Sequence, residues 1–389
     1  MVRLKKILKG YTFRLYPNNE QKILIEKSFG CSRYIYNYFL DKTNGRKYIK
    51  TFDYIKDLPL LSKEKEWLKE VDSCLLRCSI FNLEDALKRH KNGNAEYPKF
   101  KNKTKSRSSY RTNNITREYN GKTYNSIEIN LKDNIIKLPK LKEIKIRGYR
   151  NLDKIEGRII NATIYKEASK YYVSLCIEQY KDIKEVPIRN VIGIDLGVKD
   201  LLATSDGTVI KNMKFIDKYE KKLKGLNRWL SRCQKGSKNR EKVKIKIQEV
   251  YSKLKNARKY FLHKTSKQLV EENDLIVTEE LKINKMVQNK KLSKKIYDAS
   301  WYELIRQLQY KSKWNGKICY QIDTYFPSSQ TCSRCGSINK NIKDLNVRMW
   351  ECPKCTNINN RDINASINIL WEGIKSYIGS RVNTELQVK

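Results

Sequence analysis

The chain has 389 residues, which is enough for two to four compact domains that need no disulfide support. Its 82 Lys and Arg residues outnumber 42 Asp and Glu, and the formal net charge of +40 predicts a polyanionic partner, most simply nucleic acid. The basic start MVRLKKILKGYTFRLYP lacks a continuous apolar run, and no later segment reaches the roughly 18 apolar residues of a membrane helix, so we expect a soluble, cytoplasmic protein.

The chain is expected to begin with a strand followed by helices. Apolar and polar residues alternate over 11–16, which predicts a half-buried strand. Asn18 with Gln21 resembles a capping box at the start of a helix over 20–42. A second helix is expected over 63–91, where apolar residues recur at helical spacing.

A basic segment follows, and its cations alternate with aromatic, Ser and Asn residues. Seven cations have no acid among them: Lys99, Lys101, Lys103, Lys105, Arg107, Arg111 and Arg117. A solvated linker is the alternative, but uncompensated cations interleaved with aromatics favour contact with phosphates. We therefore predict a nucleic-acid-binding loop.

The two-residue period then returns in a series of short segments. These are 127–131, 135–138, 144–147, 159–165 and 171–178. Such a series predicts an antiparallel sheet or small barrel, which the first strand of the chain should complete, with the helical region as an insertion. After the polar stretch KDIKEVPIRN the pattern changes to strand, hairpin, long basic helices, strand and helix, which predicts a second domain.

The second half contains acids next to buried strands. An apolar strand over 191–194 ends at Asp195, and the turn Ser205-Asp206-Gly207 is expected to join the next two strands in a hairpin. A second apolar strand over 275–277 leads to Glu279 and Glu280, of which only one can share a sheet face with Asp195. A cap or an exposed ion pair is the alternative for each acid.

A third acid, Asp362, begins a helix whose apolar stripe should dock on the sheet, although a helix N-terminal cap is the alternative. Three carboxylates brought together repel one another and raise their pKa values unless divalent cations hold them ionised. Two magnesium ions about 3.5 to 4 Å apart would activate a water and stabilise the leaving oxygen of a phosphodiester. The pattern therefore predicts nuclease chemistry.

Four cysteines lie between the second and third acids, in the spacing C-x2-C-x16-C-x2-C: Cys332, Cys335, Cys352 and Cys355. This spacing predicts a zinc ribbon with a closed, structural zinc site. His90 and His263 are the only histidines of the chain, which excludes a Cys2His2 finger and a His-rich catalytic zinc site.

The segment 211–264 has nineteen Lys or Arg against four acids, and it predicts either a channel lining for nucleic acid or a solvated helical hairpin.

These motifs, in this order, resemble the TnpB (OrfB) family. GIDLGVKDLLATSDG, IVTEEL, SSQTCSRCG with CPKC, and RDINASINIL are similar to its RuvC-like nuclease half. KGYTFRLYPNNEQ, FGCSRYIYNYFL, YPKFKNK and IKLPKL are similar to its amino-terminal half. Two positions depart from the family pattern: Asn360 replaces an acid that many relatives have, and Glu280 replaces an Asp that commonly follows the catalytic Glu.

The resemblance implies an α+β, multidomain, bilobed fold. It pairs an antiparallel β-barrel wedge with an inserted helical lobe, and an RNase H-like (RuvC-like) α/β nuclease domain with an inserted zinc ribbon. The implied boundaries are 1–18 and 118–188 for the wedge, 19–117 for the helical recognition lobe, 189–326 and 361–389 for the nuclease domain, and 327–360 for the ribbon, which would bind target nucleic acid.

The resemblance further implies an RNA-guided DNA endonuclease encoded by an insertion sequence. Asp195, Glu279 and Asp362 would be catalytic and hold two Mg²⁺, and one Zn²⁺ would be structural. The implied partners are a transposon-derived guide RNA and double-stranded target DNA beside a short adjacent motif, with guide pairing reading the rest of the target. A monomer at the nucleoid of a prokaryote is the implied setting.

Three other functions fit part of the pattern. A guided DNA-binding regulator without cleavage would not need all three acids, which are present here. A strand-transfer transposase, or an accessory DNA-binding protein of one, commonly orders its acids Asp, Asp, Glu, whereas this chain has Asp, Glu, Asp. A zinc-ribbon RNA-binding protein with structural acids would be excluded by metal-dependent cleavage.

Overall fold

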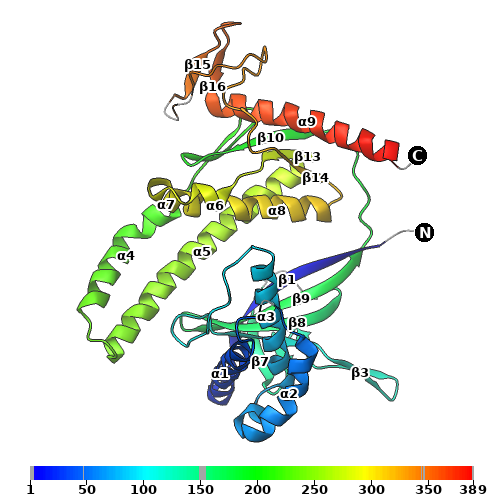
Figure 1. Cartoon of the computed structure of the whole chain (residues 1–389), viewed down its shortest axis with the longest axis vertical. Coiled ribbons are helices and arrows are strands. Elements are labelled where there is room, and N and C mark those ends of the chain that lie inside the picture. The colour runs from blue at the N-terminus through cyan, green and yellow to red at the C-terminus, as the bar shows by residue number, and fades with distance from the viewer. Residues whose placement is uncertain (1–3, 47, 149–154, 343, 345–346, 388–389) are drawn as a thin grey trace. The chain divides into compact units, whose positions relative to one another are not determined.

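The computed structural model describes residues 4–46, 48–148, 155–342, 344 and 347–387. The chain divides into two compact units, Met1–Asp182 and Ile183–Lys389, and each has its own hydrophobic core (Figure 1). Across the described residues we find no helix with the length and apolar character needed to cross a membrane.

The first unit is built on an antiparallel sheet of seven strands in the order β2-β8-β9-β1-β7-β6-β5. Its strands are β1 (Lys5–Tyr16), β2 (Ser109–Asn113), β5 (Glu128–Asn130), β6 (Ile135–Leu138), β7 (Lys142–Arg147), β8 (Arg158–Glu167) and β9 (Lys170–Lys181). As predicted, the first strand of the chain completes the sheet, because β1 pairs with β9 along most of its length and with β7 at its end.

The predicted β-barrel is wrong, because this sheet stays open: among the described residues, no pairing joins the edge strands β2 and β5. Helix α3 (Ser73–Lys91) and its N-cap residue Asp72 instead accept hydrogen bonds from β2. The N–H of Asn113 donates to Cys74 Sγ at 3.3 Å, and the hydroxyl of Thr112 donates to Asp72 at 2.5 Å. The helical insertion thus covers an edge that barrel closure would need.

The helices of this unit are α1 (Asn19–Lys42), α2 (Thr51–Glu64), a 3₁₀ turn η1 (Glu66–Glu70) and α3. The predicted capping box is confirmed, since Asn18 and Gln21 accept each other's backbone N–H at 2.8 and 3.0 Å. The predicted helix over 63–91 is wrong in its first part. Asp72 is extended and accepts the N–H of Cys74, so it caps α3 and ends any continuous helix there.

A separate hairpin follows β2 and consists of β3 (Thr116–Tyr119) and β4 (Lys122–Asn125) (Figure 1). Two cations expected in a loop therefore lie in strands: Arg111 in β2 and Arg117 in β3. Alternating side chains predicted the longer strands, but β2 to β4 carry no apolar alternation. The loop predicted over 99–117 contains β2 and the start of β3, and no strand was predicted over β4.

The second unit has a mixed sheet in the order β12-β11-β10-β13-β14. Its strands are β10 (Val191–Leu196), β11 (Asp200–Thr204), β12 (Val209–Lys211), β13 (Leu275–Glu279) and β14 (Ile318–Ile322). Strands β10, β13 and β14 are parallel, and β11 and β12 are antiparallel to their neighbours. The predicted hairpin turn at Ser205-Asp206-Gly207 is confirmed, with Gly207 at φ +88°.

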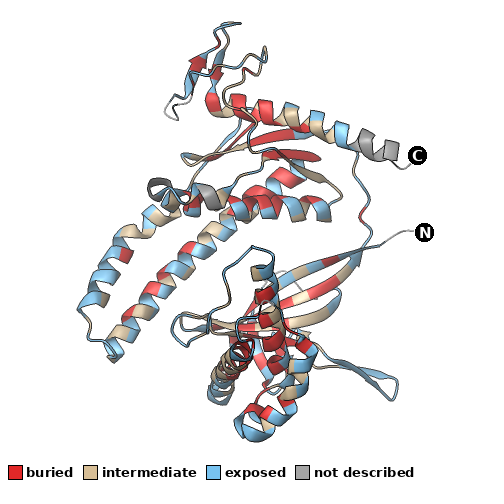
Figure 2. Cartoon of the chain, viewed as in Figure 1, coloured by how far each residue is buried: buried red, intermediate tan, exposed pale blue. Residues whose placement is uncertain are grey.

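Helices cover both faces of this sheet (Figure 2). The helices of this unit are α4 (Phe215–Arg232), α5 (Lys238–Glu272), α6 (Ile283–Met286), α7 (Lys290–Ala299), α8 (Trp301–Trp314) and α9 (Arg361–Gln387), of which α4 packs on α5 and not on the sheet. Ile194 and Ile276 pack with residues of α5 and α8 on one face, whereas Leu275 and Val277 pack with Ile369 of α9 on the other. The small strands β15 (Met349–Glu351) and β16 (Ile358–Asn360) form a ribbon before α9.

Candidate active site and zinc ribbon

Two of the predicted acids lie side by side at the carboxyl ends of parallel strands. Ile194 of β10 is opposite Thr278 of β13, so the following residues, Asp195 and Glu279, are neighbours across the two strands. Side-chain alternation turns both toward α9, and Glu280 is exposed. The chain thus presents two carboxylates on one sheet edge.

The third acid comes from α9, and two glycines allow that helix to lie close to the sheet. A Cβ on Gly193 of β10 would overlap the carbonyl oxygen of Ser366, and a Cβ on Gly373 of α9 would overlap Val277. No larger residue fits at either position without a shift of the helix. This close approach brings the first turn of α9, with Asp362, to the edge where Asp195 lies.

Asp362 does not cap its helix. The side chain of Asn360 accepts the N–H groups of Asp362 at 3.1 Å and of Ile363 at 3.3 Å, so it performs the capping role. The two carboxylate oxygens of Asp362 instead both accept from the guanidinium of Arg348, at 3.0 Å each. The departure at Asn360 therefore leaves Asp362 facing the cavity.

All three acids line one cavity of about 1030 Å³. Its charged lining also includes Lys199, Lys214, Asp217, Lys294, Lys295, Asp298, Asp344, Arg348 and Arg361. Six lining residues are acids and six are Lys or Arg, so acids and cations are balanced in a protein that is strongly basic as a whole. This arrangement provides anionic groups for a cation and cations for a phosphate backbone.

Burial and neighbouring charges shift the pKa values of the acids in the cavity. Burial, and then the neighbouring Glu279 and Asp362, raise the pKa of Asp195 to about 7. Burial also raises the pKa of Glu279, while a hydrogen bond from the hydroxyl of Ser328 opposes this rise. Such shifts are typical of sites where a cation or a reaction requires closely spaced carboxylates.

The chemistry of these donors fits a hard divalent cation such as Mg²⁺, which prefers carboxylate oxygens. Within the described part of the chain, however, these three carboxylates do not bring their oxygens within 4.8 Å of one another. The guanidinium of Arg348 provides the positive charge next to Asp362. Asp195 and Glu279 are neighbours on adjacent strands, and Asp362 lines the same cavity from α9, so these three carboxylates are the candidate ligands.

The four predicted zinc ligands do converge. The sulfur atoms of Cys332, Cys335, Cys352 and Cys355 all lie within 4.8 Å of one another. Backbone hydrogen bonds of 2.9 Å from Gly336 to Cys332 and from Thr356 to Cys352 form two matching turns. The side chain of Ser337 lies 3.2 Å from Cys352 Sγ, and this contact lowers the pKa of Cys352 to about 6, which favours the thiolate that binds zinc. The cluster can hold one structural Zn²⁺.

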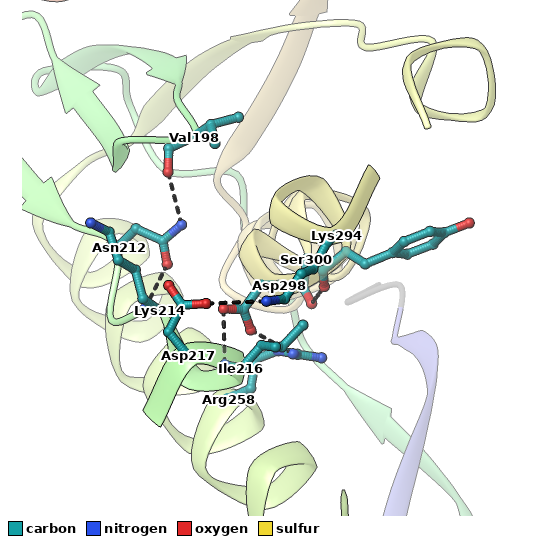
Figure 3. Close-up of polar contacts among 10 residues, drawn as sticks. Val198, Asn212, Lys214, Ile216, Asp217, Arg258, Lys294, Asp298 and Ser300 are labelled. Carbon is teal, nitrogen blue, oxygen red and sulfur yellow. Dashed lines mark hydrogen bonds and ion pairs between the residues drawn. The ribbon is translucent and has the colours of Figure 1, made fainter. Parts of the chain in front are cut away.

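A polar network closes one side of the cavity around the buried side chain of Asp298 (Figure 3). Its carboxylate accepts the N–H of Ile216 at 3.1 Å and the guanidinium of Arg258 at 2.6 Å. Lys294, which also lines the cavity, forms an ion pair of 3.5 Å with Asp217. These contacts join α7 to α4 and α5 and fix the first turn of α4 at the cavity.

The seven cations predicted to bind nucleic acid differ in how accessible they are. Five are exposed: Lys99, Lys103, Lys105, Arg107 and Arg117. Arg111 is half-buried. The ammonium of Lys101 lies 3.6 Å from the centroid of the Tyr36 ring, and burial lowers its pKa to about 8. The amide of Asn37 holds the backbone N–H and C=O of Lys101 at 2.8 Å each, so this residue anchors the loop to α1.

Sequence patterns did not identify Arg348, Ser328 or Asp298 as residues of the cavity. Arg348 and Ser328 both lie in the Cys-rich segment, in which the spacing marks only the cysteines. Asp298 could have been noticed, because it is an acid among the lysines of α7, but its partners come from distant helices. His263 is not in the cavity lining, and its backbone carbonyl accepts a hydrogen bond from Lys311 at 2.8 Å.

Three family models match the chain. The description "Probable transposase" covers residues 174–290, "Cas12f1-like, TNB domain" covers 301–369, and "Helix-turn-helix domain" covers 1–47. In the range 1–47 the described residues form β1 and the whole of α1. Together the models cover the two acids on the strands, the ribbon, and Asp362 at the start of α9.

Two relatives align along nearly their whole length. "Putative RNA-guided DNA endonuclease" of Streptomyces pristinaespiralis is 31% identical over 95% of this chain and 90% of its own. "Putative RNA-guided DNA endonuclease InsQ" of Escherichia coli is 30% identical over 95% of this chain and 93% of its own. The solved "Cryo-EM structure of the Cas12f1-sgRNA-target DNA complex" shares the fold, with a TM-score of 0.55 and 14% identity over 94% of this chain and 98% of that one.

The order of motifs, the mixed fold with its cysteine cluster and the two full-length relatives therefore agree. The chain belongs to the TnpB (OrfB) family of RNA-guided DNA endonucleases encoded by insertion sequences.

Proposed function

We propose that the protein is a magnesium-dependent DNA endonuclease guided by a transposon-derived RNA, with one RuvC-like active site. The observation that carries this proposal is the pairing of Asp195 with Glu279 on parallel strands, in one cavity with Asp362. The relatives' names supply the class of substrate, and the net charge of +40 suits a protein that holds RNA and DNA together.

The sheet supports an RNase H-like assignment of the nuclease domain. Counted from β10, its strands lie in the order 3-2-1-4-5, with the second strand antiparallel to the first. The acids stand on the first and fourth of these strands and on the following long helix α9. The ribbon enters between the fifth strand and that helix, as the proposed domain boundaries 327–360 require.

We assign the metal-binding role to Asp195, Glu279 and Asp362, with two Mg²⁺ shared among them. Magnesium, when bound, supplies the Lewis acid and the activated water for in-line hydrolysis of a phosphodiester. Asp195 and Glu279 provide a fixed pair of ligands because sheet hydrogen bonds hold their backbones. For Asp362 to bind the metal, the guanidinium of Arg348 must first leave its carboxylate.

The remaining domains would bind the nucleic acids. The wedge (1–18 and 118–188) and the helical lobe (19–117) are proposed to read the target-adjacent motif and hold the guide, with the exposed cations of the basic loop on phosphates. The zinc ribbon would bind target nucleic acid beside the cavity. The protein is proposed to act as a monomer at the nucleoid of a prokaryotic cell.

The proposal is tested by coexpression of the protein with its flanking genomic DNA. RNA that copurifies is sequenced, and the complex is given a library of guide-matched targets with randomised flanks in Mg²⁺. We expect one RNA species and cleavage beside a fixed flanking motif. Asp195→Ala should bind the same targets and leave them uncut, whereas Glu280→Gln, an exposed neighbour of Glu279, should cut them normally.

Each other outcome selects a different function. Guided binding by the wild type without cleavage would identify a regulator that has lost its nuclease activity. A complex without a defined RNA would contradict both guided functions and favour a zinc-ribbon protein with structural acids.

A further inference from the structure

The hairpin β3–β4 is unusual because it is ordered without a core. Its eight strand residues are exposed or half-buried, and it forms a two-stranded sheet separate from the main one. In Figures 1 and 2 it extends away from the other strands of the first unit as an exposed ribbon. Isolated two-stranded hairpins are marginally stable in water, so burial does not explain why this one is formed.

The base of the hairpin is held firmly. The amide of Asn114 donates to Asn125 at 3.1 Å and to the carbonyl of Ile159 in β8 at 3.1 Å. The side-chain oxygen of Asn114 accepts the N–H of Ile127 at 2.9 Å, and Ser126 Oγ accepts the N–H of Ile115 at 2.8 Å. One asparagine thus joins both strands of the hairpin to the main sheet.

The tip is also well defined. Asn120 and Gly121 connect the strands, and both have positive φ, at +50° and +70°. Asn-Gly at these angles is typical of the type I′ turn, whose twist matches that of the flanking strands. The hairpin is therefore an arm with a fixed base and a tight turn. Strands of four residues give it a reach of about 13 Å.

The two faces of this arm differ in chemistry. Arg117 is paired with Tyr124, and Tyr119 with Lys122, so these four side chains share one face on which cations and aromatics alternate. The opposite face carries Thr116, Glu118, Thr123 and Asn125. The first face has two positive charges and the second has one negative charge, although both are open to solvent.

The aromatic side chains of the charged face are exposed to an extent that core formation does not explain. Tyr119 is 69% and Tyr124 is 51% exposed. None of the four side chains on this face forms a hydrogen bond or an ion pair with another residue that the structure describes. The face has the composition of a nucleic-acid contact, in which Arg and Lys neutralise phosphates and Tyr packs on sugars or bases.

We propose that this face binds double-stranded target DNA outside the segment paired with the guide. The inference rests on the proposed function, since it assumes that target DNA is brought to this protein. A two-stranded β-ribbon fits the major groove of B-form DNA, about 12 Å wide and 8.5 Å deep, and this arm is long enough to enter it. The deep, narrow major groove of A-form RNA does not admit such a ribbon, which favours duplex DNA over the guide.

Binding measurements on guide-loaded complexes test this proposal. All proteins carry Asp195→Ala, so that binding is measured without cleavage. The test variant is Arg117→Gln with Lys122→Gln. The control is Lys267→Gln with Lys375→Gln, which removes the same charge from exposed lysines of the proposed nuclease domain that lie outside the cavity lining. Thermal unfolding of each variant confirms that the fold is unchanged.

Three ligands separate the possible occupants. The guide-loaded complexes are given a duplex that extends beyond both ends of the guide-matched segment, or a single-stranded DNA of that segment alone, and the guide-free proteins are given the guide RNA. For the extended duplex we expect the test variant to lose roughly tenfold in affinity and the slope of log K against log salt to fall by about 1.8, since two phosphate contacts are lost. Affinities for the other two ligands, and all affinities of the control, should not change.

Equal binding of the extended duplex by the test and control variants would overturn the proposal. Weaker binding of the guide RNA or of the single strand would also overturn it, and would assign the arm to those ligands. If the unsubstituted parent shows no guided binding, the proposed function itself fails. The same salt slopes, measured for the guide-free chain on duplex of unrelated sequence, then still decide whether the arm contacts duplex DNA.

Discussion

The carboxylate of Asp195 lies where its charge is unfavourable for folding. Its pKa rises to about 7, so between about pH 4 and pH 7 the folded state keeps a proton that the unfolded state has released. The stability of the metal-free protein must therefore decrease as pH rises through this window. A functional acid that destabilises its own fold is what a metal-binding role would produce.

Asp195→Asn should therefore stabilise the protein while it abolishes cleavage. At pH 8 without Mg²⁺ we expect its free energy of unfolding to exceed that of the wild type by about 1 to 2 kcal/mol, and the difference should vanish below pH 4. Urea unfolding across this pH range, with zinc retained, measures it. A variant that is less stable than the wild type at pH 8, or a difference independent of pH, would show that the carboxylate is structural.

Arg348 occupies the position of a competing cation. Its guanidinium contacts both oxygens of Asp362, so a metal must displace it. We expect Arg348→Gln to bind Mn²⁺, used as a spectroscopic substitute for Mg²⁺, about fivefold more tightly, since a partly exposed ion pair contributes roughly 1 kcal/mol. Electron paramagnetic resonance titration measures this affinity, with Asp195→Ala as the variant that should bind weakly. Unchanged or weaker binding in Arg348→Gln would contradict the competition.

Among the secondary-structure elements, α9 connects packing to chemistry. Gly193→Ala places a methyl group against the carbonyl of Ser366 and must shift the helix that carries Asp362. We expect a loss of stability of about 1 to 3 kcal/mol and a larger loss of cleavage rate. Gly225→Ala in α4 is the matched control, because its Cβ meets nothing within 4 Å and should stabilise that helix by up to about 1 kcal/mol.

These two glycine variants are compared by thermal unfolding and by cleavage rate. If Gly193→Ala were as stable and as active as the wild type, close packing of α9 would not be what positions Asp362. The comparison separates this cause from the general effect of adding a methyl group to the chain.

The ribbon is the other element whose role can be isolated. Cys332→Ser removes one of four converging thiolates, so we expect the purified protein to lose its zinc and the ribbon to unfold. Cys233→Ser is the control, because Cys233 lies on the α4–α5 hairpin away from the cluster. Zinc content by mass spectrometry should be about one per chain in the wild type and the control. Full zinc content in Cys332→Ser would overturn the assignment.

Over the whole molecule, sequence patterns predicted what depends on neighbours in the chain. The Asn18–Gln21 capping box, the long strands and the four cysteines were found because periodicity and spacing are local properties. The strand pattern left an open sheet and a barrel as alternatives, because closure depends on whether α3 or β5 covers the edge of β2, and these segments are distant in sequence. Local signals do not determine such a competition.

The candidate site was predicted in the same uneven way. Asp195 and Glu279 at strand ends and Asp362 at the start of a helix were predicted as candidates, but the residues around them were not. Arg348 and Asp298 reach the cavity only through the folding of the ribbon and of α7, and no motif marks them. The exposed arm formed by β3 and β4 was not predicted, because its strands have no apolar face.

We propose that the cavity of Asp195, Glu279 and Asp362 cuts DNA selected by a bound RNA. The most direct measurement is a cleavage time course of a guide-matched duplex by the purified RNA complex, with and without Mg²⁺, for wild type, Asp195→Asn and Glu280→Gln. We predict cleavage by the wild type and Glu280→Gln only when Mg²⁺ is present, and none by Asp195→Asn at any Mg²⁺ concentration. Cleavage by Asp195→Asn at the wild-type rate would contradict the account.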